Sequence, residues 1–129
     1  MPTERRSNLN KMIDEEYIAE VVRWDMGHSI SALWDWSKKY PPFKGDLSLS
    51  KKGFFYLAER FMREGILKLG HQGKFLPGSI EEQLQCFEAS WPADYDENVE
   101  EKDIDNLWWL LFAPAGAVWI YPDGHEVWT

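Results

Sequence analysis

Seven carboxylates lie within twelve residues of the C-terminal half, and they are the densest group of chemically active side chains in the chain. They are Asp94, Asp96, Glu97, Glu100, Glu101, Asp103 and Asp105. Lys102 is the only cation among them, and such a stretch is typical either of a solvated connection or of a surface that attracts a positively charged partner. Trp91 and Trp108 flank the acids, and aromatic anchors often hold an interface whose charges accelerate encounter. We therefore predict that the seven acids, Trp91 and Trp108 form a partner-binding surface.

The charge of the chain divides near Pro77. Residues 1–76 contain 13 Lys or Arg against 10 acids, a net charge of +3, whereas residues 77–129 contain one cation against 12 acids, a net of −11. Together they give the net charge of −8. This asymmetry favours a basic protein partner over nucleic acid, because the acidic half repels phosphates.

The residues that most often perform catalysis or bind metals do not form a known pattern. His28, His71 and His125 are isolated from one another and from other ligands, and the chain contains no HExxH or CxxC motif. The single cysteine, Cys86, has no histidine at a recognisable partner position, so a structural thiol is the favoured interpretation. We predict a protein that is not an enzyme and has no catalytic residues, metal or cofactor.

Length and composition indicate one folded domain. The chain has 129 residues, 44% of them apolar and 16% aromatic, which is enough for a hydrophobic core. We expect a single domain over residues 1–129, with residues 1–9 flexible because they are polar and terminal. The sequence has neither a signal-peptide pattern nor a long apolar run, so we predict a cytoplasmic protein without membrane contact.

Apolar spacing predicts three helices in the first half of the chain. They span about 10–24, about 29–40 and the region from Ser50, as N-cap, to Gly65. A short hairpin is predicted over 66–76, around Gly70–Gly73. Ser79 and Glu82 then form a capping box that predicts a further helix ending near Trp91.

The C-terminal region predicts antiparallel strands. Pro122-Asp123-Gly124 lies between two runs rich in aromatic and β-branched residues, which indicates a hairpin. Leu107–Phe112 fits either a third strand or a helix, and we favour the strand. The fold class is therefore α+β: helices, one small hairpin, a further helix and a C-terminal antiparallel meander. An exposed edge of that meander could support a homodimer.

Residues 29–76 raise an alternative function. Helix, turn, helix and hairpin is the order of a winged helix, and this segment has a net charge of +5 from 9 cations and 4 acids. Lys51, Lys52, Arg60 and Arg63 would then contact the phosphates of DNA. Glu59 and Glu64 interrupt this basic face, so we favour a winged-helix-like segment that does not bind DNA.

Several motifs in sequence order resemble a known family. They are Leu-Ser-Leu-Ser before Phe54–Leu69, then Leu76–Gln83, Trp91-Pro92 and the closing segment Pro114–Thr129. Residues 47–129 resemble a family of small bacterial domains of unknown function, some of which act as immunity proteins in contact-dependent inhibition and related polymorphic-toxin systems. The resemblance implies a cytosolic antitoxin for a delivered toxin domain, often a basic nuclease. The acidic surface is inferred from charge alone, because the resemblance identifies no binding residues.

Our leading hypothesis combines these observations. The chain would be a non-catalytic immunity protein that binds and neutralises a cognate basic toxin domain, with the acidic, Trp-flanked surface as its contact. The alternative hypothesis is a winged-helix-like module that binds DNA or regulates another protein.

Overall fold

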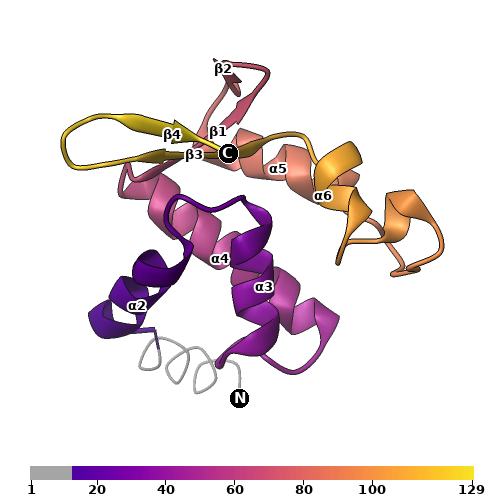
Figure 1. The fold of residues 1–129 in the computed structure, drawn as a ribbon. Coiled ribbons are helices and arrows are strands. Elements are labelled where there is room, and N and C mark those ends of the chain that lie inside the picture. The colour runs from indigo at the N-terminus through magenta and orange to yellow at the C-terminus, as the bar shows by residue number, and fades with distance from the viewer. Residues whose placement is uncertain (1–12) are drawn as a thin grey trace.

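The computed structural model describes residues 13–129 (Figure 1). The expected flexibility of residues 1–9 and the expected helix start near residue 10 lie outside this range. The described helices are α2 (Glu15–Asp25), α3 (Ser31–Lys39), α4 (Leu47–Arg63), α5 (Ile80–Ser90), the 3₁₀ helix η1 (Glu100–Lys102) and α6 (Leu107–Leu111). Within residues 13–129, no helix combines the length and the apolar character needed to cross a membrane.

Two helix caps were predicted from the sequence, and the structure confirms one of them. The capping box of α5 is confirmed, with Ser79 Oγ accepting from Glu82 N and Glu82 accepting from Ser79 N. For α4, the prediction of Ser50 as N-cap is wrong, because Asp46 accepts from Leu49 N and starts the helix earlier. Ser50 is buried instead, and its hydroxyl lies 3.3 Å from the carbonyl oxygens of Ser37 and Phe43.

Both predicted hairpins are present and join into one sheet. Strands β1 (Leu67–His71), β2 (Lys74–Phe75), β3 (Gly116–Ile120) and β4 (Glu126–Trp128) are antiparallel in the order β2-β1-β3-β4. The register places Leu69 opposite Ala117 and Val118 opposite Trp128. The α+β fold class is therefore confirmed.

Helix α4 forms the centre of the helical layer, where it contacts α3, α5 and β1 and passes below the sheet (Figure 1). Its buried face includes Leu57 and Phe61, and the Phe61 ring lies 6.2 Å from that of Trp119 on β3. Trp119 is fully buried, and its indole N–H donates to the carbonyl of His28 at 2.7 Å. Burial of these aromatic side chains fixes the sheet on the helices.

The preference for a strand at Leu107–Phe112 is wrong, because this run contains the short helix α6. A strand would place Trp108 and Trp109 on opposite faces, whereas one helical turn lets both indoles pack together, with ring centroids 4.9 Å apart. Both edges of β3 are already paired, with β1 and β4, so no position beside it remains for a third partner.

Candidate functional site

An aromatic cluster is joined by hydrogen bonds to the end of the acidic segment, which we define as residues 94–105. The cluster consists of Trp34, Phe54, Trp91, Trp108 and Trp109. Trp91 ends α5 and is central to the cluster, with ring centroids 5.3 Å from Trp34, 5.5 Å from Phe54 and 5.3 Å from Trp108. Such dense aromatic packing gives the loop that follows a rigid base.

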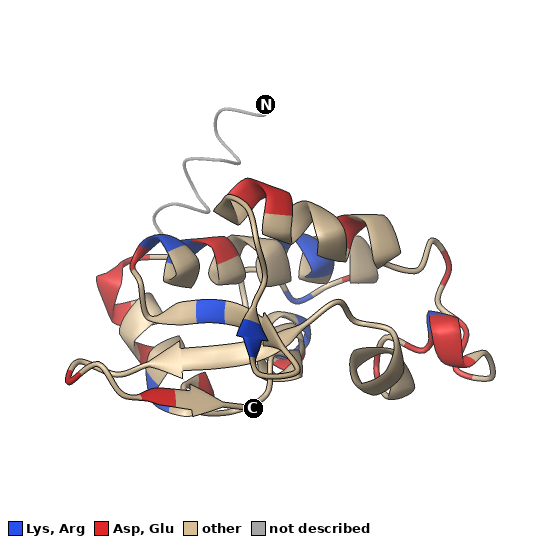
Figure 2. Ribbon diagram, turned by 90° about the horizontal axis from the view of Figure 1, so that it is seen from above, with Lys and Arg blue, Asp and Glu red and all other residues tan. Residues whose placement is uncertain are grey.

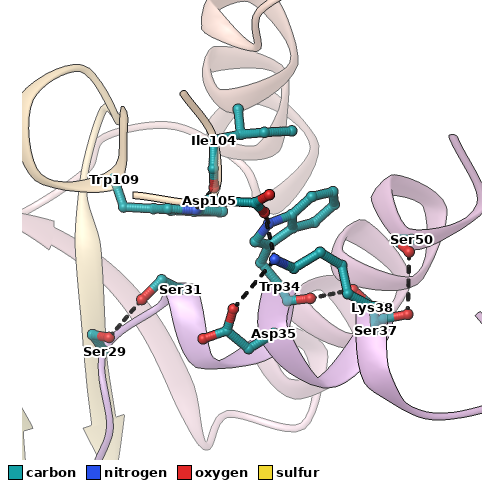
Figure 3. Close-up of polar contacts among 10 residues, drawn as sticks. All are labelled: Ser29, Ser31, Trp34, Asp35, Ser37, Lys38, Ser50, Ile104, Asp105 and Trp109. Carbon is teal, nitrogen blue, oxygen red and sulfur yellow. Dashed lines mark hydrogen bonds and ion pairs between the residues drawn. The ribbon is translucent and has the colours of Figure 1, made fainter. Parts of the chain in front are cut away.

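The indole N–H groups attach this cluster to the chain around the acidic segment. Trp108 Nε1 donates to the carbonyl of Ser90 at 3.3 Å, and Trp109 Nε1 donates to the carbonyl of Ile104 at 2.6 Å. Trp34 Nε1 donates to Asp105 Oδ1 at 3.0 Å (Figure 3). Each bond gives a largely enclosed donor a partner and also fixes the backbone or side chain that accepts it.

Asp105 is therefore the anchor of the acidic segment on α3. The same Oδ1 also accepts from the ammonium group of Lys38, which lies 3.7 Å from Asp35 as well (Figure 3). Partial burial acts to raise the pKa of Asp105, but the hydrogen bonds from Lys38 and Trp34 outweigh it and lower the pKa below its ordinary value. Asp105 remains ionised and holds two groups of α3 at neutral pH.

The acidic segment is closed by its own hydrogen bonds. Asp96 N donates to the carbonyl of Lys102 at 3.2 Å, and Val99 N donates to that of Asp96 at 3.1 Å. The Asp96 side chain also accepts from Asn98 N at 2.9 Å. Asp96 therefore shapes the loop with its carboxylate and its backbone.

Five of the seven acids are exposed, and four of them, unlike Asp105, make no bond to the core within the described part of the chain. These four are Asp94, Glu97, Glu100 and Glu101, and the acidic segment that contains them lies at one end of the molecule (Figure 2). Within residues 13–129, the only ion pair formed by these four joins Asp94 to Lys102 at 3.9 Å, with the Asp94 side chain 81% exposed. A concentration of negative charge therefore faces solvent there.

The remaining predicted site residues have other positions. Asp103 is buried, with 5% of its surface exposed, and its carbonyl accepts from Asn106 N and Trp108 N at the start of α6. Trp108 is 1% exposed, so it supports the surface from below, whereas Trp91 is half-buried at its edge. The structure thus brings all the predicted residues into one region but places only some of them on its surface.

An exposed apolar patch lies beside the acids, and the sequence analysis missed it. Helix α6 packs against η1, yet Leu110, Leu111 and Phe112 at its end are 80%, 52% and 39% exposed. Leu110 and Leu111 line a groove of about 440 Å³ together with Trp109, Ile30 and the end of the sheet. The signal was the length of the apolar run, because one short helix cannot bury six consecutive apolar side chains.

The basic residues of the DNA-binding alternative are largely paired with acids of the chain itself. Lys51 contacts Glu88 at 2.7 Å, and Arg63 contacts Glu59 and Glu81 at 2.7 and 2.5 Å. Arg60 contacts Glu15 and Glu64 at 2.8 and 2.5 Å. Lys52, the fourth cation, is exposed. These pairs reduce the positive field that α4 presents to solvent.

Candidate metal ligands and nucleophiles stay apart in the folded chain. Within the part of the chain that the structure describes, no three His, Cys, Asp or Glu side chains are grouped so that they could hold a metal ion. Cys86, for which a structural thiol was the favoured interpretation, is a free and exposed cysteine on α5. The His125 ring contacts Asp123 in the β3–β4 turn. The Oδ1 atom of Asp123 also accepts from His125 N at 3.0 Å.

Comparisons with known proteins identify the family. No curated protein sequence matches the chain. A solved structure of an uncharacterised protein conserved in bacteria, from Neisseria meningitidis, is similar over 99% of this chain and 98% of its own, with 30% identity and a TM-score of 0.75. The profile of the family described as "Protein of unknown function, DUF596" matches residues 62–129, which include the sheet, α5, the acidic segment and α6. The chain belongs to the DUF596 family.

Proposed function

We propose that this protein is an immunity protein that binds and neutralises a basic toxin domain, and that its contact surface is the acidic platform. The acidic platform consists of Asp94, Glu97, Glu100 and Glu101 together with the apolar patch Leu110, Leu111 and Phe112. The observation that carries the proposal is the contact between η1, which contains Glu100 and Glu101, and α6, whose end carries the exposed apolar patch. Residues 47–129 resemble a family of domains of unknown function, some of which act as immunity proteins, and this resemblance suggests the class of partner.

The two parts of the platform have different roles in binding. Exposed carboxylates attract a basic partner at a distance, which raises the association rate and makes it sensitive to salt. Apolar side chains that become buried on contact slow dissociation, because they leave water only in the complex. A toxin nuclease has a cationic cleft for its nucleic acid, so the acidic platform would cover that cleft or a surface close to it.

The aromatic base supports binding by limiting the entropy lost on association. Asp105, Asp96 and Trp91 hold the acidic segment before any partner arrives. A loop that is already ordered loses less freedom when it binds than a mobile one does. No catalytic step is required of the protein in this account.

The DNA-binding alternative has less support. The ion pairs of Lys51, Arg60 and Arg63 occupy the cations that would contact phosphates. A duplex would also meet the field of the acidic platform, which repels it at low salt. We therefore place the basic residues of α4 in a structural role.

The test is protection of cells that express the cognate toxin domain. That domain is sought at the C-terminus of a large secreted protein encoded directly upstream. We expect the wild-type chain to restore growth and the double variant Glu100→Lys/Glu101→Lys to lose protection, with association slowed about tenfold or more.

A matched control separates position from net charge. Glu16→Lys/Glu126→Lys changes the net charge by the same amount on α2 and β4, away from the acidic platform. This control should protect like the wild type. Protection by the Glu100/Glu101 variant equal to that by the control would contradict a role of the acidic platform in neutralisation.

A further inference from the structure

A second pocket of interest lies between α2 and α3. The pocket has a volume of about 250 Å³ and lies apart from the residues of the acidic platform. Its lining combines aromatic and charged side chains: Trp24, Asp25, His28, Ala32, Asp35, Trp36, Lys39 and Tyr40.

One residue that lines this pocket has a carboxylate oxygen without a partner among the described residues. Asp25, the last residue of α2, is only 7% exposed, and its Oδ2 is buried without a hydrogen bond from any described residue. A buried acceptor of this kind destabilises the folded chain unless a donor satisfies it. Its place at the C-terminal end of a helix adds to the cost, since the helix dipole there disfavours negative charge.

The walls of the pocket are aromatic. The ring centroids of Trp36 and Tyr40 lie 4.4 Å apart on α3. Trp24 on α2 is 61% exposed, and its indole N–H donates to Glu20 at 2.8 Å. Aromatic faces around a carboxylate create a site that favours a cation over a neutral or anionic group.

Other charged and titratable groups surround Asp25. Asp35 on α3 adds negative charge close to it and acts, with burial, on its pKa. The remaining groups are Tyr17 on α2, His28 between the helices, and Lys39 and Tyr40 at the end of α3. Among the described residues, no ion pair joins Lys39 to Asp25, so the Asp25 carboxylate has no cationic partner there.

We propose that the α2–α3 pocket binds one protonated primary amine or guanidinium group. Its N–H donors would satisfy Asp25 while the rings of Trp24 and Trp36 contact its carbon chain and its charge. A quaternary ammonium has the charge but no N–H donor, so it should bind more weakly. The group can come from a small amine or from a Lys or Arg side chain of another protein.

Binding to this pocket should be coupled to protons. Burial, followed by the charge of Asp35, raises the pKa of Asp25 from 3.8 to about 7. A bound cation favours the ionised carboxylate, so it lowers this pKa and releases a proton. Affinity should therefore rise as the pH increases through 7 and level off above it.

The experiment titrates the full chain with n-butylammonium, n-butylguanidinium, tetramethylammonium and acetate. Binding is followed at pH 6 and pH 8 by the indole N–H resonances of Trp24 and Trp36. We expect n-butylammonium and n-butylguanidinium to shift both resonances and to bind more tightly at pH 8 than at pH 6. Asp25→Asn should weaken the binding of both cations about tenfold or more. Trp24→Ala, at an exposed position, should also weaken binding without affecting folding.

Two further arms complete the test. Blocked tripeptides Gly-Lys-Gly and Gly-Arg-Gly distinguish the two sources of the cationic group. Tighter binding of the tripeptides than of the butyl cations indicates a protein side chain, and weaker binding indicates a small amine. The proposal is overturned if neither butyl cation shifts Trp24 and Trp36, or if Asp25→Asn binds them as well as the wild type. No toxin is needed, so this result is independent of the proposed function.

Discussion

Trp34 Nε1 and Asp105 Oδ1 lie 3.0 Å apart and join helix α3 to the acidic segment across 71 positions of sequence. Trp34 is fully buried, so this bond is the point at which the core determines where the surface acids lie. Lys38 reaches the same oxygen from one turn further along α3. The acidic segment is thus attached to the core, which distinguishes it from a solvated linker.

Removal of the Asp105 carboxylate should loosen this attachment. Asp105→Ala leaves the buried N–H of Trp34 without its acceptor and should lower the free energy of unfolding by about 1–3 kcal/mol. Asp105→Asn retains an oxygen acceptor and should cost less. Urea denaturation measures both, and Asp94→Ala, at an exposed position, serves as the control. Equal stability of Asp105→Ala and Asp94→Ala would show that the bond does not hold the segment.

The stability due to Asp105 should depend on pH. Its pKa is lower in the folded chain than the ordinary 3.8, so its contribution is present above that value and is lost as the pH falls further. Hydrogen exchange of the Trp34 indole N–H should accelerate in acid beyond the change seen for Trp119, whose acceptor is a backbone carbonyl.

Two substitutions on helix α6 should differ widely in their effect on stability. Trp108 is 1% exposed within the aromatic cluster, so Trp108→Ala should destabilise the chain by about 3–5 kcal/mol. Leu110 is 80% exposed, so Leu110→Ser should change stability by less than about 0.5 kcal/mol. Thermal unfolding of both variants checks this. A large loss of stability in Leu110→Ser would mean that the apolar patch is covered within the chain itself.

The contribution of Asp25 to the stability of the folded chain should depend on pH in the opposite direction to that of Asp105. Its pKa is raised from 3.8 to about 7 on folding, so the unfolded chain loses its proton first and stability falls as the pH rises from 4 to 7. The full effect is at most about 4 kcal/mol. Asp25→Asn should remove this fall, which denaturant titrations at pH 5 and pH 8 will measure. If the wild type and Asp25→Asn respond identically to pH, the carboxylate is not held in a buried state.

Much of the fold follows from local sequence signals. The Ser79–Glu82 capping box starts α5, and the Pro122-Asp123-Gly124 turn joins β3 to β4. Both depend on hydrogen bonds between residues close in sequence, so the sequence alone identifies them. The run at residues 107–112 was misassigned because its residues suit both a strand and a helix. Its structure depends on packing with Phe54 and Trp91, far away in sequence.

The sequence could locate the candidate site but could not distinguish the roles of its individual residues. Charge density identified residues 94–105, yet no sequence pattern separates Asp105, which binds Trp34, from Glu100, which faces solvent. The same limit applies to tryptophan. Trp24 fits the apolar spacing of its helix as well as Val21 does, but only Val21 meets the core.

The most direct test of the central claim is the kinetics of binding to the cognate toxin domain, measured for three chains at low and high salt. We predict that Glu100→Lys/Glu101→Lys mainly lowers the association rate and its salt dependence. Leu110→Ser/Leu111→Ser should mainly raise the dissociation rate, about tenfold or more, because apolar surface no longer becomes buried. Rates for both variants equal to those of the wild type would contradict the acidic platform as the binding surface.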